Sequence, residues 1–152
     1  MKNLYALLLH SVGLSISEAA ALHKVPEATV TDWILGQESP PTDALKFLYA
    51  HVDLQAHAAD WLLHYIRKER PENINLCISD DEKEAGTLGW PTPSVMNGAV
   101  RRFLEMADDD IRHRTTIILN PTTTAERTGL LFAGVHLKED GSFADPDDPP
   151  EE

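Results

Sequence analysis

Five side chains in one short segment, EATVTD, could make specific hydrogen bonds and methyl contacts. Glu27 and Asp32 carry carboxylates, Thr29 and Thr31 carry hydroxyls, and Ala28 carries a methyl group. A hydroxyl donates and accepts hydrogen bonds, whereas a carboxylate only accepts them. These groups match what base pairs present in the major groove of DNA, where a carboxylate accepts from cytosine N4 and an apolar group contacts the thymine methyl. The segment predicts a base-contacting surface, provided that a helix presents it.

The residues before this segment predict the first helix of a helix-turn-helix. Ser15 is a suitable N-cap, and Glu18 three residues later completes the capping-box pattern. Ala19 and Ala20 are small, so a second helix can cross close to this one. Two short helices joined by a tight turn are the unit that places a recognition helix in the major groove.

The turn and the second helix have equally clear limits. Val25-Pro26 interrupts the first helix, because the residue before proline avoids helical angles and proline favours the first helical position. The second helix is predicted over residues 27–35. Gly36 can end it in the left-handed conformation that glycine adopts at little cost. Its inward-facing residues are predicted to be Val30, Trp33 and Ile34.

Apolar stripes on both sides of this unit predict three more helices. The first stripe consists of Leu4, Leu7, Leu8 and Val12. Residues 39–42, SPPT, signal a turn and a helix start. A fourth helix then follows with Leu45, Leu48, Tyr49 and Val52 at helical spacing, and a fifth is predicted over residues 54–68. We therefore expect a five-helix, all-α domain over residues 1–70.

On these residues the chain resembles the lambda-repressor or Cro-like family of DNA-binding domains over residues 1–66. The positions that carry the resemblance are Ala20, Val25, Val30, Trp33 and Gly36, followed by the proline-containing turn. Gly89-Trp90, the alanine pair and the order of the elements are also similar to phage- and plasmid-type regulators, which include anti-CRISPR-associated repressors. The resemblance implies a transcriptional repressor that binds double-stranded DNA.

Three positions depart from the family pattern. Lys24 stands at the turn where the family usually has glycine, and His23 stands where it usually has a buried aliphatic residue. Ile16 begins the first helix of the pair, where a polar residue often contacts phosphate. The phosphate contacts are therefore expected from other residues. The candidates are Lys24, Lys46, Arg67 and Lys68.

The charge of the chain leaves a second function open. The formal net charge is −12, whereas a DNA-binding domain usually carries a basic patch. Residues 1–70 hold six Lys and Arg against eight Asp and Glu, so most of the acidity lies in residues 71–152. The alternative is an acidic protein-interaction module that uses the helix-turn-helix fold to dock a basic partner.

The second half predicts a small mixed region over residues 71–137. Residues 73–79 and 115–119 have strand-like composition, and Thr92-Pro93 begins a predicted amphipathic helix that runs to about Ala107. Residues 129–137 form a last apolar segment. Residues 138–152 are acidic and proline-containing, and we expect them to be disordered. The predicted fold class is α+β: a helix-turn-helix domain, a β-α-β-like dimerisation region and an acidic tail.

Other groups of titratable residues are interpreted as solvated side chains or as charges that balance their neighbours. His57, Asp60 and His64 share a helix face but are predicted to be solvated, as is the acidic stretch of residues 80–84. Arg112 and Arg114 are expected to balance the adjacent aspartates, and Arg101-Arg102 carries the same interpretation. We expect no metal and no cofactor.

The sequence also excludes several classes of protein. Cys77, the one cysteine, rules out an internal disulfide and lies in an apolar run where we expect a buried thiol. No pattern of a known catalytic motif occurs, so we expect no enzyme activity. No apolar stretch reaches the length of a membrane span, and we expect a cytoplasmic protein. The prediction is a sequence-specific DNA-binding transcriptional regulator that acts as a homodimer.

Overall fold

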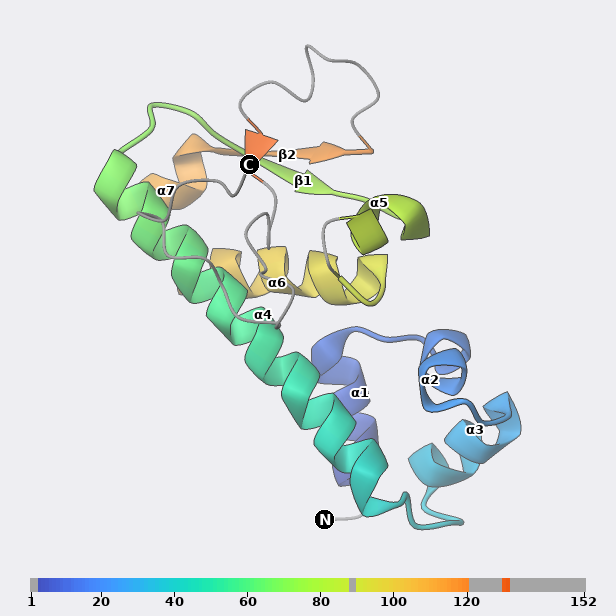
Figure 1. The fold of residues 1–152 in the computed structure, drawn as a ribbon. Coiled ribbons are helices and arrows are strands. Elements are labelled where there is room, and N and C mark those ends of the chain that lie inside the picture. Colours follow the sequence, from blue (N-terminus) through green and yellow to red (C-terminus); the bar gives the residue numbers. More distant parts are fainter. Residues whose placement is uncertain (1–2, 88–89, 121–129, 132–152) are drawn as a thin grey trace, which may run out of the picture. The chain divides into compact units, whose positions relative to one another are not determined.

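The computed structural model describes residues 3–87, 90–120 and 130–131, and it is mostly helical with a small parallel sheet (Figure 1). This composition agrees with the predicted α+β class. The chain divides into two compact units, unit 1 over Met1–Gln55 and unit 2 over Ala56–Glu152. The boundary predicted from the sequence lies at residue 70.

Unit 1 begins with three short helices that all end in the same way. They are α1 (Leu4–Val12), α2 (Ile16–His23) and α3 (Glu27–Leu35). The residues that follow them, Gly13, Lys24 and Gly36, have left-handed backbone angles. In each case two backbone N–H groups reach back to the last turn, as in Val25 N to Ala20 O at 3.0 Å. This is the Schellman arrangement, which satisfies carbonyl groups that the helix leaves unpaired.

The fourth helix corrects the five-helix prediction. A single helix, α4 (Thr42–Glu69), replaces the two helices that the sequence suggested, and the expected break near Leu54 is absent. No glycine or proline occurs within it, so nothing interrupts its backbone hydrogen bonds. Within unit 1, Gln55 is buried and its Nε2 donates to the Val12 carbonyl at 2.8 Å, which ties α4 to the end of α1.

Unit 2 places one strand at the centre of a three-stranded parallel sheet. The strand order is β2 (Thr115–Leu119), β1 (Ile74–Ile78) and β3 (Leu130–Leu131). Helices α5 (Glu82–Thr87), α6 (Pro93–Met106) and α7 (Asp109–Arg114) connect β1 to β2. The predicted strands and the start of α6 at Thr92-Pro93 are confirmed, and Thr92 Oγ1 accepts from Val95 N as the N-cap.

Two predicted acidic segments turn out to begin helices. The stretch of residues 80–84 was expected to be a loop, but Asp81 accepts from Lys83 N at 2.8 Å and α5 starts at Glu82. Asp108 similarly accepts from Ile111 N at 2.9 Å and caps α7. A carboxylate satisfies the unpaired N–H groups of a first helical turn and interacts favourably with the helix dipole. Acidic clusters in this chain therefore serve as helix starts.

Polar side chains secure the carboxyl ends of the strands in unit 2. Asn97 of α6 pairs with the backbone of Ser79, because its Oδ1 accepts from Ser79 N and its Nδ2 donates to Ser79 O. Asn120, after β2, accepts from Asp80 N at 3.0 Å through its Oδ1 and donates from its Nδ2 to the Asp80 carboxylate at 2.8 Å. These contacts hold the loop after β1 against α6 and β2.

Two further sequence predictions fall largely outside the described residues. Only Leu130–Leu131 is described from the last apolar segment of residues 129–137. The acidic tail of residues 138–152 lies wholly outside them. Among the described residues, no single helix combines the length and the apolar character needed to cross a bilayer.

The left-handed turn at Lys24 predicts the effect of one substitution. A residue with a Cβ atom is disfavoured at φ 57°, and glycine is not. We therefore expect Lys24→Gly to raise the free energy of unfolding by about 1 kcal/mol. Urea unfolding of the full chain measures this, with Lys24→Ala as the control, since alanine keeps the backbone strain. Equal stability of the glycine and alanine variants would show that the turn is unstrained.

Candidate nucleic-acid interface

The helix pair α2–α3 is held together by local signals that the sequence predicted. Ser15 Oγ accepts from Glu18 N at 3.1 Å, and the Glu18 carboxylate accepts from Ser15 N at 2.8 Å. This capping box fixes the start of α2. Ala19 and Ala20 are buried, as predicted for the side of α2 that faces its neighbours. The two helices lie side by side in Figure 1, joined by the short turn at Lys24.

Helix α3 buries one side and leaves the predicted contact residues on the other. Val30 is fully buried and Trp33 is 5% exposed. Glu27 and Ala28, in the first turn, are exposed. The remaining predicted contact residues of α3 are half-buried, and they are Thr29, Thr31 and Asp32. The structure therefore brings five of the seven predicted site residues onto one short helix.

The hydroxyl of Thr31 is already engaged by its own helix. Thr31 Oγ1 donates to the Glu27 carbonyl at 3.0 Å. Its lone pairs remain able to accept a hydrogen bond, but its proton is used. Thr31 can therefore accept from a base amino group in this rotamer, whereas the sequence alone left it as either donor or acceptor.

The two predicted lysines lie on different elements. Lys24 is exposed in the turn between α2 and α3, and Lys46 is exposed in the first turns of α4. Its neighbour Phe47 packs on His23, with ring centroids 4.9 Å apart, so this part of α4 lies against the end of α2. Neither lysine forms an ion pair within the described residues, which leaves both ammonium groups available to an external anion.

A cluster of five ring-bearing residues lies behind α3, and we call it the aromatic cluster. The rings of Tyr5 and Trp33 meet edge to face at 5.3 Å, and His23 lies 5.9 and 5.7 Å from them. His51 stands 4.1 Å from Phe47 and places its Nδ1 2.7 Å from the Phe47 carbonyl oxygen. Such edge-to-face pairs add to the stabilisation from burial. All four helices of unit 1 contribute a ring.

Two polar atoms inside the aromatic cluster have no hydrogen-bond partner within the described residues. They are Tyr5 Oη and His23 Nε2, and both are buried. Burial raises the pKa of Tyr5 to about 12. Burial also lowers the pKa of His23, and the nearby charge of His51 adds to this effect. Both side chains are therefore held in their neutral forms at neutral pH.

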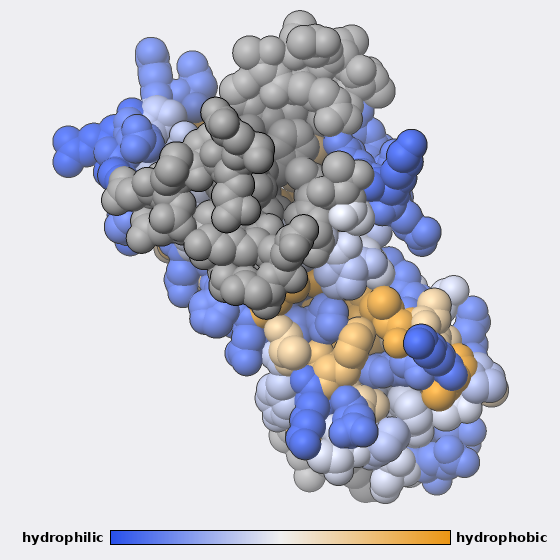
Figure 2. All heavy atoms as spheres, viewed as in Figure 1, coloured by the Kyte–Doolittle hydropathy of each residue, from blue (hydrophilic) through white to orange (hydrophobic). Residues whose placement is uncertain are grey.

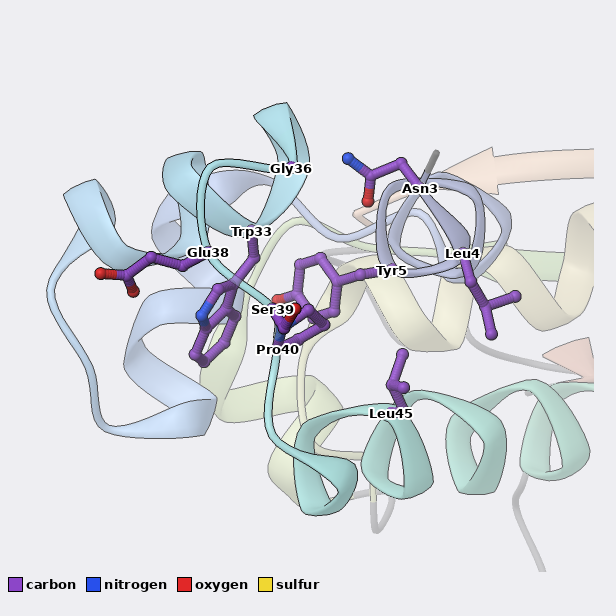
Figure 3. A pocket seen from close by; sticks show the side chains of 9 residues that line it. All are labelled: Asn3, Leu4, Tyr5, Trp33, Gly36, Glu38, Ser39, Pro40 and Leu45. Carbon is purple, nitrogen blue, oxygen red and sulfur yellow. The ribbon is translucent and has the colours of Figure 1, made fainter. Parts of the chain in front are cut away.

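A pocket of about 350 Å³ lies beside the aromatic cluster, between the start of α1, the end of α3 and the loop before α4. Figure 3 shows the Tyr5 and Trp33 rings close together, Leu45 reaching in from α4, and the Glu38 carboxylate pointing away from them. No lysine or arginine lines the pocket. It therefore does not suit a phosphate, and its Trp33 wall belongs to the inward side of α3.

The other histidines and the cysteine that the sequence analysis considered do not form a second site within the described residues. His57, Asp60 and His64 are exposed on α4, and no group of metal-binding side chains occurs in the described residues. Cys77 is buried in β1, as predicted.

Exposed apolar side chains also occur on unit 1. Figure 2 shows apolar residues gathered over α1 and α2, where Leu7 and Ile16 are exposed.

The two arginines of α7 pair with nearby aspartates, as the sequence suggested. Arg112 lies 3.3 Å from Asp109, and Arg114 lies 2.9 Å from Asp110. Both also donate to backbone carbonyls: Arg112 Nε reaches Leu104 O at 2.8 Å, and Arg114 reaches Pro71 O. These contacts brace α7 within unit 2, so the cluster is explained without an external anion.

Sequence reasoning did not identify Tyr5, Phe47 or His51 as members of one cluster. Each lies in a helix whose apolar stripe was recognised, but the pairing of rings from α1 and α4 depends on tertiary packing. The one available signal was His23, which stands at a position where the resembled family has an aliphatic residue. A polar ring at a half-buried position implies neighbours that can accommodate it.

Comparison with known proteins adds no family to this description. No protein-family model matches the chain, and no curated protein matches it.

The contacts of Trp33 and Tyr5 predict two different mutational outcomes. Trp33→Ala removes the ring that joins α3 to α1 and α2, and we expect a loss of about 3–5 kcal/mol in the free energy of unfolding. Tyr5→Phe removes only the unpartnered hydroxyl, so we expect a change within about 1 kcal/mol and of either sign. Chemical unfolding of both variants measures this contrast.

A large loss of stability in Tyr5→Phe would show that the Tyr5 hydroxyl has a partner that holds the fold. An unchanged stability in Trp33→Ala would show that Trp33 does not join the helices.

Proposed function

We propose that this protein binds double-stranded DNA sequence-specifically through α2 and α3, as a transcriptional regulator of the repressor type. The observation that carries the proposal is the arrangement of α3, which buries Val30 and Trp33 and leaves polar side chains on its other side. Its connection to α2 by a tight left-handed turn supports the same function.

The start of α3 offers a suitable place for a phosphate. Pro26 is its N-cap residue and makes no side-chain cap hydrogen bond. The N–H groups of the first turn are therefore not covered by a capping side chain, and such a helix end favours an anion. Lys24 precedes it in the turn and adds a positive charge. These groups would position α3, while its outward side chains select the bases.

Each outward side chain of α3 has a distinct chemistry toward a base pair. Asp32 and Glu27 can accept from the cytosine amino group, and Thr31 can accept in the same way. Ala28 suits a thymine methyl group. Thr29 can both donate and accept. The set favours sites that present amino donors and methyl groups, and it lacks the arginine that most often contacts guanine.

The shortage of positive charge on this surface favours a dimer. Few counterions are released when only Lys24, Lys46 and a helix end meet phosphates, so a single domain binds non-specific DNA poorly. Two copies that contact half-sites one helical turn apart combine their energies. We therefore propose that a homodimer binds the operator.

Within the predicted β-α-β-like dimerisation region, a strand edge suits such a dimer better than the amphipathic helix does. The predicted amphipathic helix, α6, is covered within a single chain, because Met96 and Phe103 are fully buried. Strand β2 pairs only with β1 among the described residues. Ile117 and Leu119 on β2 are 38% and 61% exposed. An apolar edge strand of this kind favours pairing with the same strand of a second copy.

The direct test is selection of bound duplexes from a random DNA pool by the full chain at low salt. The proposal predicts enrichment of a two-part motif whose halves are about one helical turn apart. The variant Trp33→Phe, which keeps an aromatic ring, is the folded control and should enrich the same motif. Absence of any enriched duplex from both proteins contradicts DNA binding.

A second function is favoured by the carboxylates around α3. Glu18, Glu27, Asp32 and Glu38 lie on or beside α2 and α3, whereas Lys24 is the one basic residue between Ser15 and Glu38. This balance favours an acidic docking surface for a basic protein partner, because complementary charge selects partners. Enrichment of no duplex, together with salt-sensitive binding of a basic model peptide that Asp32→Ala weakens, would support this alternative.

The proposed roles of Asp32 in base contact and of Lys24 and Lys46 in phosphate contact predict how three variants differ on the enriched duplex. Asp32→Ala should relax preference at one base pair by about 1–3 kcal/mol. Lys46→Ala should weaken binding to all duplexes alike and lower the salt slope by about one, and Lys24→Gly should do the same although it stabilises the fold. Fluorescence anisotropy across salt concentrations measures both effects. Equal losses from all three variants on every duplex would contradict base contact by Asp32.

The exposed edge of β2 predicts the assembly state. Leu119→Lys places a charge on the proposed strand pair. We therefore expect the dissociation constant of the dimer to rise at least about tenfold, while the fold of the chain is kept. Sedimentation equilibrium measures the dissociation constant, and Met106→Lys, an exposed residue of α6, is the matched control. A monomer at high concentration in the unmodified chain would refute the dimer.

A further inference from the structure

His23 occupies an unusual place for a titratable side chain, because it is half-buried among aromatic rings of unit 1 and its Nε2 atom is fully covered. Its ring centroid lies 4.9 Å from that of Phe47, 5.7 Å from Trp33 and 5.9 Å from Tyr5. These three rings come from α4, α3 and α1. His23 is therefore the point at which α2 meets every other helix of the unit.

The surroundings of His23 accommodate its neutral ring but offer no acceptor to a proton on Nε2. Nε2 is buried and has no hydrogen-bond partner in the described part of the chain. A protonated imidazole carries an N–H donor on both nitrogens. A buried charged donor without an acceptor is costly, so the protonated ring is more stable in water than in the aromatic cluster.

Among the titratable groups around His23, His51 opposes its protonation. On α1 the nearest is Tyr5, whose phenol stays neutral, and on α4 it is His51, whose charge opposes a second positive charge. The residue of α3 in ring contact is Trp33, which does not titrate. On α2 itself, the next residue in the chain is the cationic Lys24. Burial is the larger cause that lowers the pKa of His23, and His51 is the second.

We propose that His23 is a pH-sensitive switch for the helix-turn-helix: protonation in mildly acidic conditions drives its ring out of the aromatic cluster and loosens the packing of α2 on α3. His23 is the last residue of α2, and Lys24 of the turn follows it directly. Movement of His23 therefore reaches the turn and the start of α3. The consequence for DNA affinity rests on the proposed function, but the consequences for stability and for the titration of His23 do not.

The sign of the pH dependence follows from the lowered pKa of His23. The unfolded chain binds the proton more readily than the folded chain, so stability rises with pH between the two pKa values. The stabilisation is fully present above the ordinary histidine pKa of about 6.5. This stabilisation is lost as the pH falls below that value, and the loss stops once the pH is below the pKa of His23 in the folded chain. Each unit of pKa difference corresponds to about a tenfold change in the folding equilibrium.

The experiment compares the full chain with His23→Leu and His64→Gln. His64 is an exposed histidine of α4, so its variant controls for the loss of one imidazole. Thermal unfolding is measured between about pH 7.5 and about pH 5.5, which brackets the ordinary histidine pKa. We expect the unmodified chain and His64→Gln to lose stability together on acidification, and His23→Leu to lose less. Parallel curves for all three proteins would overturn the proposal.

A second measurement keeps the test valid if His23→Leu does not fold. Histidine ring resonances of the folded chain are followed by NMR through the same pH range, with His51→Gln as the comparison. We expect His23 to titrate below its ordinary pKa, and His51→Gln to bring that pKa closer to the ordinary value. A His23 pKa at or above the ordinary value would contradict the switch.

The final measurement adds a duplex that the pool selection has enriched. Affinity of the unmodified chain should fall several-fold more between neutral and acidic pH than affinity of His23→Leu. If stability and titration follow the prediction but no duplex binds at any pH, the proposed function fails and the switch acts on folding alone. If the duplex binds equally in both proteins at every pH, the switch does not reach α3 and that part of the proposal is wrong.

Discussion

The packing of Trp33 against Tyr5 and His23 is the contact on which the arrangement of unit 1 depends. It joins the inward side of α3 to α1 and α2, and Phe47 extends the same contact to α4. Helices this short are marginal on their own, so tertiary packing must stabilise them. Because one side of α3 is held by these rings, its orientation and the set of side chains on its other side are fixed together.

This constraint also determines what the outward side of α3 can do. Once Val30 and Trp33 are buried, α3 exposes short polar side chains together with Ala28 and the 64% exposed Leu35, and it carries no lysine or arginine. Such a surface suits hydrogen bonds to base edges better than contacts with many phosphates. Because this surface has little positive charge, the proposed function includes a second copy of the chain. It also assigns a phosphate contact to Lys24, although a lysine is disfavoured in the left-handed backbone conformation of the turn.

The signals that succeeded in the sequence analysis were local ones. Pro26 and Gly36 predicted the limits of α3, and Thr92-Pro93 predicted the start of α6, because capping and turn residues act through their own backbone angles. The prediction failed for α4, where a second run of apolar residues at helical spacing was interpreted as a separate helix although no glycine or proline was present. The stretch of residues 80–84 was predicted to be a solvated loop, and the helix that Asp81 begins there was not predicted. The aromatic cluster could not be predicted, because its rings meet only through tertiary packing, and the same limit applies to the covered face of α6.

The most direct test of the account is an amide chemical-shift map of the labelled full chain titrated with a short DNA duplex at low salt. The account predicts that the largest shifts fall between Lys24 and Asp32, with smaller shifts near Lys46. This pattern would place the duplex on the outward side of α3, opposite the rings that hold it. Shifts confined to unit 2, or the absence of any shift at low salt, would contradict the claim that α3 is the surface through which this protein binds DNA.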